Sequence, residues 1–526
     1  MTYLLAYDIG TTGVKTCLFE VEKTIRLVDC AGKGYPLYIL ENGGAEQDSE
    51  DWWNAMRQST AEVLARTGIA PEKIAGISFC SQMQGLVLVD QDGVPVHRPM
   101  SYMDQRAREE IRKGIAHGFQ IAGANVVKLV KSLIITGAVS GSVKDPVWKY
   151  KWLENHEPDN FKRAYRWLDV KDYLTSRCTG RFTMTTDSAF ATLIYDTRKG
   201  KEGWSAAMCD MLGVHKEHLP EIIRSTDMVG GLTAKAAAEL GLAEGTPVYG
   251  GGGDSSLIGV GAGCVGVGDT HIYWGTSGWV ITVTDKQMVD VTAMIAAIVG
   301  AQPGRFNYFA EMETAGKCLE WAKLHLAQDE IDLYSVKTPS EENTYDLMSR
   351  AAASVPIGSG GVLFTPWLHG NRCPFEDPNA TGMFFGLGLE TTKAHMIRAV
   401  IEGVCYHLRW MLESQDKQLK TADTIRFVGG GALSPVICEI LADVTGRRIE
   451  TVDSPQNVGS VGAAAVMAAG MGIIPSLSSV RDFIPAAQTY EPNTENHRSY
   501  EQYYNTFRKL YGANRKLYRA TARKES

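Results

Sequence analysis

Asp254 lies where a run of glycines meets a predicted helix, and it is the best candidate in the chain for acid–base chemistry. Four glycines, residues 250–253, precede it, and Ser255 and Ser256 follow it. Consecutive glycines are costly in backbone entropy, so they mark a place where the chain takes positive φ or lets another group approach its backbone. A carboxylate in the first turn of the next helix then faces a cleft, where a general base is needed. The alternative is that Asp254 only caps this helix, which is a common role of Asp.

Three other glycine-rich stretches predict phosphate or nucleotide binding. Residues 10–13 read Gly-Thr-Thr-Gly, residues 275–278 read Gly-Thr-Ser-Gly, and residues 429–432 read Gly-Gly-Gly-Ala. Glycine lets backbone N–H groups point at phosphate oxygens without obstruction from a side chain. The sequence contains no Gly-x-x-x-x-Gly-Lys-[Ser/Thr] motif, so the chain is not a P-loop protein.

A second acid, Asp8, ends the first predicted strand beside the turn at residues 10–13. Asp8 and Asp254 both fall at predicted strand ends, where open α/β sheets bind their ligands. One acid that holds a hydrated Mg²⁺ and another that takes a proton from a hydroxyl would suffice for phosphoryl transfer, because the protein's task there is positioning and charge stabilisation. Lys15, just after the turn, could contact a phosphate, and a solvated strand lysine is the simpler alternative.

The elements that would position these residues occur twice along the chain. Residues 3–20 predict a β-hairpin that bends at the first hydroxyl turn, and residues 271–283 predict the same arrangement around the second. Near the end of each half, a strand leads into a glycine run and a helix: the strand is at 247–249 in the first half and at 424–428 in the second. We interpret the repeat as a duplication that gives two α/β domains of like build facing each other. Chance is the alternative, because Gly and Thr are common turn formers.

The composition is that of an ordinary globular chain. Of 526 residues, 44% are apolar and 21% are charged, and the length suggests two or more domains. The net charge of -7 argues against nucleic acid or an anionic membrane as the main partner. The ten cysteines are scattered without a CxxC pair, which predicts reduced core residues of a cytoplasmic protein.

The two ends of the sequence and its longest uncharged run predict no membrane element. The N-terminus lacks a basic region and reaches Asp8 too early for a signal peptide. Residues 454–477 carry no charge but are rich in Gly and Ala and contain Pro455, so a buried helix is expected there. Apolar and aromatic residues at helical spacing in the basic tail predict an amphipathic closing helix: Tyr504, Leu510, Tyr511 and Tyr518.

Taken in order, these stretches resemble the FGGY carbohydrate kinases, a family within the actin, Hsp70 and sugar-kinase superfamily. The matching segments are the first phosphate turn at 8–15, the sugar loop at 81–85, the catalytic acid at 252–254, the second phosphate turn at 275–278 and the adenosine loop at 429–432. Three later segments resemble the xylulokinase branch: residues 364–374, 380–387 and 398–404. The resemblance spans roughly residues 3–470, and several motifs in one order are more specific than any single motif.

The resemblance implies an α/β fold of two ribonuclease H-like (actin-like ATPase) domains facing across an interdomain cleft. The expected divisions are a sugar-binding domain at 1–257, a nucleotide-binding domain at 258–480 and a helical tail at 481–526. The enzyme would phosphorylate a hydroxyl of a small sugar or polyol from Mg-ATP, with Asp254 as general base. The implied sugar contacts are Met83, Gln84, Asp104 and Asp254. The implied ATP contacts are Thr12, Lys15, Gly275, Thr276, Gly430, Gly431 and Ala432, and the implied Mg²⁺ ligands are Asp8 and Asp254.

One residue of the sugar loop departs from the family pattern. Xylulokinases usually carry Gln-Met-His-Gly there, whereas the third position in this chain is Gln84. Imidazole and carboxamide differ in reach and donor pattern, and a site built around particular hydroxyls discriminates strongly. D-xylulose is the leading substrate, and ribulose, gluconate, erythritol or another sugar or polyol are the alternatives. The segment at 114–145 also departs from the pattern, and its sequence assigns no element to it.

Two other classes of function stay open. A sugar-sensing pseudokinase would bind ligand without turnover, but nothing needed for transfer is missing from the sequence. An actin-like or Hsp70-like ATPase is disfavoured by the sugar loop and by the lack of a peptide-binding domain. The expected partner is a small molecule, not nucleic acid or membrane. The sequence does not reveal the oligomeric state, for which a homodimer is one option.

Overall fold

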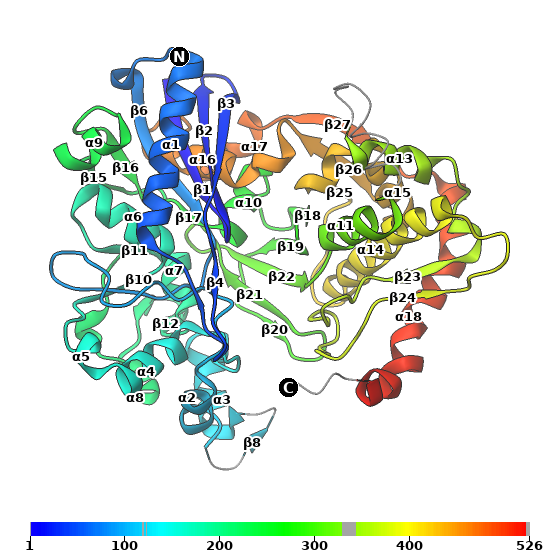
Figure 1. The fold of residues 1–526 in the computed structure, drawn as a ribbon, viewed down its shortest axis with the longest axis horizontal. Coiled ribbons are helices and arrows are strands. Elements are labelled where there is room, and N and C mark those ends of the chain that lie inside the picture. Colours follow the sequence, from blue (N-terminus) through cyan, green and yellow to red (C-terminus); the bar gives the residue numbers. More distant parts are fainter. Residues whose placement is uncertain (1, 118–119, 122–123, 329–342, 522–526) are drawn as a thin grey trace.

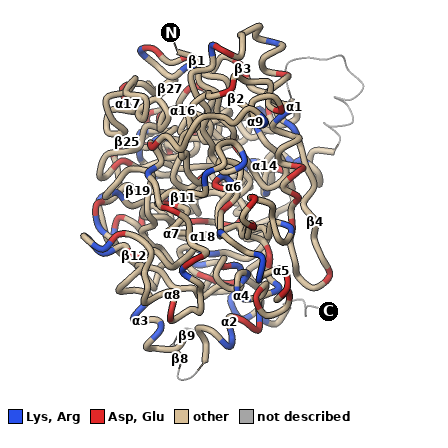
Figure 2. The backbone as a smooth tube through the Cα atoms, turned by 90° about the vertical axis from the view of Figure 1, so that its left-hand side faces the viewer, with Lys and Arg blue, Asp and Glu red and all other residues tan. Residues whose placement is uncertain are grey.

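The protein is built on two large β-sheets with helices between and outside them (Figure 1). The computed structural model describes residues 2–117, 120–121, 124–328 and 343–521. The first sheet lies on the left of Figure 1, and the second runs from its middle to its right. Lys and Arg residues are interspersed with Asp and Glu on the face shown in Figure 2. Among the described helices, none combines the length and the apolar character that a bilayer crossing needs.

The first sheet has seven strands. Its order is β15 (Met228–Gly231), β16 (Pro247–Tyr249), β6 (Ile74–Ser81), β1 (Thr2–Ile9), β2 (Gly13–Val21) and β3 (Ile25–Gly34), with β17 (Gly252–Gly253) also beside β6. Strands β1, β2 and β3 form an antiparallel meander, and β6 and β16 run parallel to β1. The hairpin predicted at residues 3–20 is confirmed, since Ile9 pairs with Val14 across the first hydroxyl turn.

The second sheet repeats this plan. Its order is β20 (Val289–Asp290), β21 (Ile295–Val299), β22 (Phe306–Met312), β19 (Gly278–Thr284), β18 (Thr270–Trp274), β25 (Thr424–Val428), β26 (Arg448–Val452) and β27 (Ala486–Tyr490). Strands β18, β19 and β22 form the meander, and β25 and β26 run parallel to β18. The succession β3-β2-β1-β6-β16 therefore matches β22-β19-β18-β25-β26, which confirms the two like-built α/β domains.

Helices form three layers around the two sheets. Outside the first sheet lie α1 (Ser49–Thr67), α6 (Val170–Thr179) and α9 (Ala234–Leu240). Outside the second lie α11 (Gly316–Leu326), α13 (Thr344–Ala353), α14 (Lys393–Asp416), α15 (Pro435–Thr445) and α18 (Thr494–Thr521). Between the sheets lie α10 (Asp254–Gly261) and α16 (Val458–Gly470), packed with apolar residues from both sheets. The uncharged run at 454–477 is thus a buried helix, as predicted.

The two central helices touch through glycines. A Cβ on Gly261 would lie 1.9 Å from the Val458 carbonyl oxygen, and one on Gly462 would lie 2.1 Å from the Leu257 carbonyl oxygen. Helix α16 also packs on β1 and β6, although it comes from the C-terminal half of the chain. The two halves therefore share one central layer.

Residues between the strands of the first half form an additional lobe with its own apolar core, at the lower left of Figure 1. Its helices are α2 (Arg108–Gly114), α3 (Val126–Ile135), α4 (Pro146–His156), α5 (Pro158–Phe161), α7 (Thr186–Ala191) and α8 (Ala206–Leu212). Its short strands are β7 (Val87–Val89), β8 (Gln120–Ile121), β9 (Ala124–Asn125), β10 (Arg166–Leu168), β11 (Thr183–Thr185), β12 (Tyr195–Asp196), β13 (Gly203–Trp204) and β14 (Glu221–Ile223). The segment at 114–145 thus contributes β8, β9 and α3 to this lobe.

The C-terminal tail packs against the second half. The helix predicted there is α18, which buries Tyr504, Leu510 and Tyr518 as expected. Strand β27, which precedes α18, pairs with β26 and extends the second sheet. The remaining short elements are β4 (Tyr38–Ile39), β5 (Ala45–Glu46), β23 (Leu363–Thr365), β24 (Met383–Phe385) and α17 (Val480–Phe483). The boundaries at 257 and 480 stay predictions.

Candidate functional site

Asp254 is the first residue of central helix α10, and the glycines before it are required by close approaches. Gly251 has φ +66°, and a Cβ on it would lie 2.1 Å from the Phe79 carbonyl oxygen. A Cβ on Gly253 would lie 2.0 Å from Sδ of Met83. The glycine run therefore brings the start of α10 against the end of β6 and the loop that follows it, as its sequence predicted.

The N-cap of α10 is Gly253, so Asp254 does not occupy the capping position. The half-buried Asp254 carboxylate accepts one local hydrogen bond, from the Ser255 N–H to Oδ1 at 2.7 Å. Its remaining lone pairs are available to a substrate hydroxyl.

The pKa of the Asp254 carboxyl is raised to about 7, chiefly by burial and in addition by the negative charges of Asp8, Glu311 and Asp169, while the Ser255 N–H opposes the shift. A group with a pKa near the operating pH is suited to general base catalysis, because it is both ionised and basic enough to accept a proton. The environment of Asp254 thus matches the role that the sequence predicted for it.

Asp8 lies at the end of β1, opposite Lys15 on β2. Burial raises the pKa of the Asp8 carboxyl, and Lys15 and Cys80 oppose this shift. A Cβ on Gly459 of α16 would lie 3.1 Å from Oδ2 of Asp8, so only a glycine leaves the carboxylate its place beside that helix. The exposed Lys15 donates from Nζ to the Gln456 carbonyl at 2.9 Å, which links β2 to the segment before α16.

The Asp8 and Asp254 carboxylates have the chemistry that Mg²⁺ requires. They are close enough for the charge of Asp8 to raise the pKa of Asp254. Within the described ranges, no three His, Cys, Asp or Glu side chains gather as a metal-binding group. Mg²⁺ is usually held by one or two carboxylates together with water and substrate phosphates, so Asp8 and Asp254 could serve as its protein ligands.

Hydrogen bonds fix the first hydroxyl turn while leaving the Thr12 side chain exposed. The Gly10 N–H donates to the Gly13 carbonyl at 2.9 Å, and the Tyr35 hydroxyl donates to the Gly10 carbonyl at 2.5 Å. Nε2 of Gln47 donates to the Thr11 carbonyl at 2.6 Å. Thr12 is exposed, so its hydroxyl can meet a ligand without moving the turn.

The second hydroxyl turn is built in the same way. Its Gly275 and Thr276 carbonyls accept the N–H groups of Gly316 and Ala315 at 2.8 and 3.1 Å, at the start of α11. A Cβ on Gly275 would lie 2.1 Å from the Tyr273 hydroxyl oxygen. The Thr276 side chain is exposed, like Thr12 in the first turn.

The glycine run at 429–432 lies beside the second turn. Gly429 has φ +92° and donates its N–H to the Pro455 carbonyl at 2.8 Å. A Cβ on Gly431 would lie 2.6 Å from Cγ of Trp274, the residue just before the second turn. Gly430 and Leu433 are exposed, whereas Ala432 is buried. The predicted phosphate and adenosine contacts of the second half are thus neighbours.

The predicted sugar contacts differ in accessibility. Met83 lies against the catalytic helix, where its Sδ accepts the Ser255 hydroxyl at 3.1 Å. Gln84 is half-buried. Asp104 is fully buried, and its Oδ2 accepts the Ala45 N–H at 2.8 Å and the Arg106 guanidinium at 2.7 Å. Direct contact between Asp104 and a sugar therefore stays a prediction.

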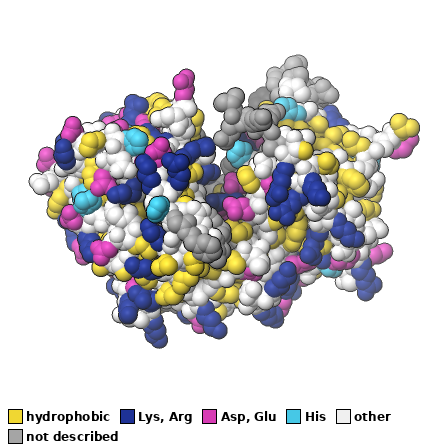
Figure 3. All heavy atoms as spheres, turned by 90° about the horizontal axis from the view of Figure 1, so that it is seen from below, with side chains coloured by type: hydrophobic (Ala, Val, Ile, Leu, Met, Phe, Trp, Pro, Cys, Tyr) yellow, Lys and Arg dark blue, Asp and Glu magenta, His cyan; other side chains and the backbone are white. Residues whose placement is uncertain are grey.

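The second half adds charged residues that the sequence did not point out. Arg372 pairs with Glu311 at the end of β22 and with Glu313, its Nε lying 3.3 Å from Oε1 of the latter. Tyr102 of the first half accepts the Thr11 hydroxyl at 3.4 Å, and burial raises its pKa with help from Asp254. Its position at the end of a strand is the feature by which Glu311 could have been recognised as a candidate site residue. Figure 3 shows the surface hollowed between the two halves.

Asp187, in α7, is another residue that the sequence did not reveal. Its Oδ2 accepts the Gly253 N–H at 2.8 Å, and its Oδ1 accepts the Ser188 N–H at 3.0 Å. Asp187 is buried and so holds the backbone directly before Asp254 in place. The sequence gives no signal for this contact, because the two residues are far apart in the chain.

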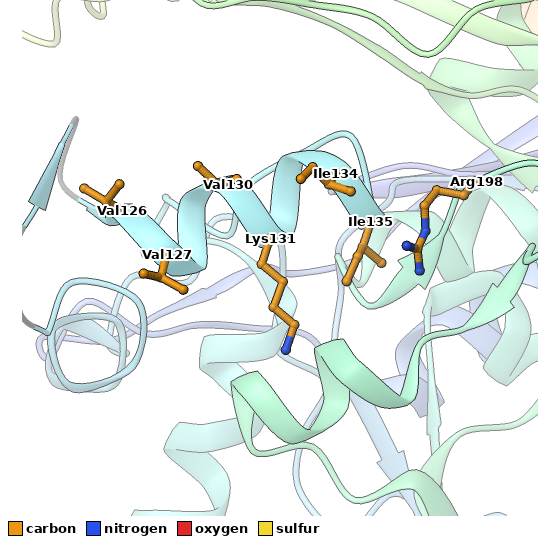
Figure 4. Close-up of a pocket in the computed structure, with 7 residues that line it drawn as sticks. All are labelled: Val126, Val127, Val130, Lys131, Ile134, Ile135 and Arg198. Atoms are coloured by element: carbon orange, nitrogen blue, oxygen red, sulfur yellow. The ribbon is translucent and has the colours of Figure 1, made fainter.

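A groove of about 530 Å³ lies along α3, away from these residues (Figure 4). It is lined by Val126, Val127, Val130, Lys131, Ile134, Ile135 and Arg198. In Figure 1, α3 lies at the lower edge of the additional lobe, whereas α10 lies in the central layer. The groove is therefore not part of the site around Asp254.

Comparison with known proteins identifies the family of this chain. The model of the N-terminal domain of the FGGY family of carbohydrate kinases matches residues 3–261, and the model of the C-terminal domain matches residues 271–471. The xylulose kinase of Bacillus subtilis is 29% identical over 503 residues, covering 95% of each chain.

Two solved structures from Lactobacillus acidophilus are similar over nearly the whole chain. The ligand-bound xylulose kinase has a TM-score of 0.84 at 25% identity and covers 98% of this chain and 99% of its own. The gluconate kinase has a TM-score of 0.83 at 26% identity and covers 98% of both. Overall similarity therefore does not distinguish between these two substrates.

Proposed function

Since this chain belongs to the FGGY family of carbohydrate kinases and is an ATP-dependent sugar kinase, we propose that its acceptor is a neutral ketopentose, with D-xylulose as first choice. The carrying observation is the Asp254 carboxyl, which lies at the start of the central helix with a pKa of about 7. In the proposed reaction Asp254 accepts the proton of the sugar hydroxyl and the sugar oxygen forms a bond to the γ-phosphorus of ATP. The bond between that phosphorus and the β,γ-bridging oxygen breaks, so ADP leaves.

The other residues of the site bind and orient the reactants. Thr12 and Thr276, exposed on rigid turns, would approach the phosphates of ATP, and the open surface at Gly430 would accept the adenosine. Asp8 and Asp254 would hold Mg²⁺, which neutralises charge on the transferring phosphoryl group when bound. Lys15 would approach the same phosphates from β2.

Electrostatics favours a neutral sugar over a sugar acid. The charged groups that raise the pKa of Asp254 are the carboxylates of Asp8, Glu311 and Asp169. A substrate carboxylate placed beside Asp254 would add a further negative charge to this group of carboxylates, whereas the hydroxyls of a ketopentose would not. Gluconate is the second candidate, supported by the similarity to a gluconate kinase.

A panel assay tests the proposal. ADP release would be followed with D-xylulose, L-xylulose, D-ribulose, D-gluconate and erythritol, each at several concentrations. We expect kcat/KM to be highest for D-xylulose and at least about tenfold lower for gluconate, because like charge and unpaired polar groups reject a wrong substrate strongly. A higher kcat/KM for gluconate contradicts the choice of substrate. Ligand binding without ADP release would favour the pseudokinase alternative. The cytoplasmic location and the homodimer stay predictions.

A further inference from the structure

Gln84, the residue that departs from the family pattern, has an unusual backbone conformation. Its φ is +60°, in the left-handed region that residues other than Gly, Asn and Asp rarely adopt. Such a conformation persists only where the surroundings hold it, and it is common at ligand-binding sites. The groups that hold Gln84 therefore determine where its carboxamide points.

Two buried charged side chains bind the backbone of Gln84, one at its N–H and the other at its carbonyl. Asp169 accepts the Gln84 N–H on Oδ2 and the Gly85 N–H on Oδ1, both at 3.0 Å. Lys149 donates from Nζ to the Gln84 carbonyl at 2.6 Å. Both peptide groups of the residue are thus engaged by charge-assisted hydrogen bonds, which are stronger than those between neutral groups.

Lys149 also ties the sugar loop to a second segment. Its Nζ donates to the Ser101 carbonyl at 2.8 Å, just before Tyr102. Lys149 lies on α4, whereas Asp169 is the N-cap of α6. The sugar loop is therefore held between two helices of the first half rather than by its own turn.

Burial indicates that these contacts are specific. Lys149 is 0% exposed and Asp169 is 4% exposed. Burial of an ammonium or a carboxylate is costly unless hydrogen bonds compensate it. The ammonium of Lys149 donates to the carbonyls of Gln84 and Ser101. The carboxylate of Asp169 accepts the N–H groups of Gln84, Gly85 and Val170. Burial lowers the pKa of Lys149 to about 8 and raises that of Asp169 to about 7.

We propose that Lys149 and Asp169 are positioning residues that fix Gln84 in its left-handed conformation and thereby set the specificity of the kinase for its sugar. The inference rests on the proposed role of Gln84 as a sugar contact. Neither residue needs to touch the substrate. Each acts through the backbone that carries the Gln84 carboxamide.

The first test replaces Lys149 by methionine, an uncharged side chain of similar length. We expect Lys149→Met to raise the KM for the sugar about tenfold or more while the KM for ATP changes less than about twofold, because only the sugar loop loses its support. Lys151→Met is the matched control on the same helix, since its Nζ binds Glu154 and the Gly213 carbonyl instead. This control should leave the KM for the sugar unchanged.

A double-mutant cycle tests whether Lys149 acts through Gln84. Glycine adopts positive φ without strain and carries no carboxamide. Gln84→Gly therefore removes the two features that Lys149 would hold in place, the strained backbone of residue 84 and the position of its side chain. In that background, Lys149→Met should lower kcat/KM for the sugar by less than about threefold, against about tenfold or more in the wild type. Equal factors in both backgrounds would show a general structural role and overturn the proposal.

Asp169→Asn tests the other side of the loop and guards against a misfolded Lys149 variant. It should raise the KM for the sugar with little change for ATP, and an unchanged KM for the sugar in a folded protein overturns the proposal. All assays use the sugar that the wild type turns over best in the panel. A result that replaces D-xylulose by another sugar therefore corrects the proposed function without deciding this test.

Discussion

At the scale of single residues, the chemistry depends on how burial changes the carboxyl groups around α10. Burial raises the pKa of both Asp254 and Asp8, and for Asp8 the positive charge of Lys15 across the hairpin opposes the shift. The sequence pointed to both acids, because each lies near a strand end and close to glycines, and their roles in the reaction stay predictions. It could not identify Asp187 or Lys149, whose roles depend on contacts with distant segments of the chain.

The pH dependence of the reaction should follow the ionisation of Asp254. Its pKa in the folded protein is about 7, so below that pH the carboxyl is protonated and cannot accept a proton. We therefore expect kcat/KM for the sugar to rise with pH through about 7 and to level off above it. Initial rates between pH 5.5 and 8.5 check this, and a profile that falls over the same interval would be inconsistent with a carboxylate base.

Asp187 should affect turnover more than binding. Its Oδ2 accepts the Gly253 N–H, so Asp187→Ala frees the backbone directly before the base. We expect kcat to fall by roughly 10- to 100-fold with a change in sugar KM of less than about threefold, because small displacements of a catalytic group are costly. The exposed Asp210 provides a control, Asp210→Ala, which should behave like the wild type. Steady-state kinetics of both variants decide the matter.

At the scale of elements, the sequence predicted what local chemistry determines. The two hairpins, the strands before the glycine runs and the closing helix were all found where their patterns placed them. The segment at 114–145 was not assigned, because it is rich in Gly, Ser and other small residues. Helix α3 within it exposes Val127, Val130 and Ile134. The pairing of β27 with β26 was also missed, since four of the five residues of β27 are exposed and give no buried-strand signal.

The contact between α10 and α16 should tolerate no side chain at Gly462. A Cβ there would lie 2.1 Å from the Leu257 carbonyl oxygen, which belongs to the backbone and cannot move aside cheaply. We expect Gly462→Ala to reduce the free energy of unfolding by about 1 to 3 kcal/mol. Gly512→Ala is the matched control in α18, where nothing lies within 4 Å of the added Cβ. It should stabilise the protein by about 0.5 to 1 kcal/mol, through helix propensity alone. Denaturant titrations of both variants measure the difference.

At the scale of the whole molecule, the two halves are like-built but not independent. The first sheet and the second sheet share α10 and α16 as a common layer, and α16 reaches back onto β1 and β6. The site uses this arrangement, because Asp254 lies at the start of a helix in that layer while the second hydroxyl turn and Glu311 belong to the other sheet. The repeat predicted the pairing of the domains, but only the packing shows which helix joins them.

The N-terminal half should not fold alone. A fragment of residues 1–262 lacks α16 and so exposes apolar residues of the first sheet, including Leu4, Ala6 and Phe19. We expect this fragment to aggregate or to bind a hydrophobic dye, and we expect co-expression with residues 263–526 to restore a soluble complex. Circular dichroism and size-exclusion chromatography check both expectations. A monomeric fragment with cooperative unfolding would contradict the shared layer.

The most direct test of the account is the turnover of Asp254→Asn. Asparagine keeps the size and the Ser255 contact of the side chain but cannot accept a proton from the sugar hydroxyl. With D-xylulose, or with whichever sugar the wild type prefers, we expect kcat to fall at least about 100-fold while ATP binding changes less than about twofold. A variant that keeps near-wild-type turnover would contradict the role of Asp254 as general base.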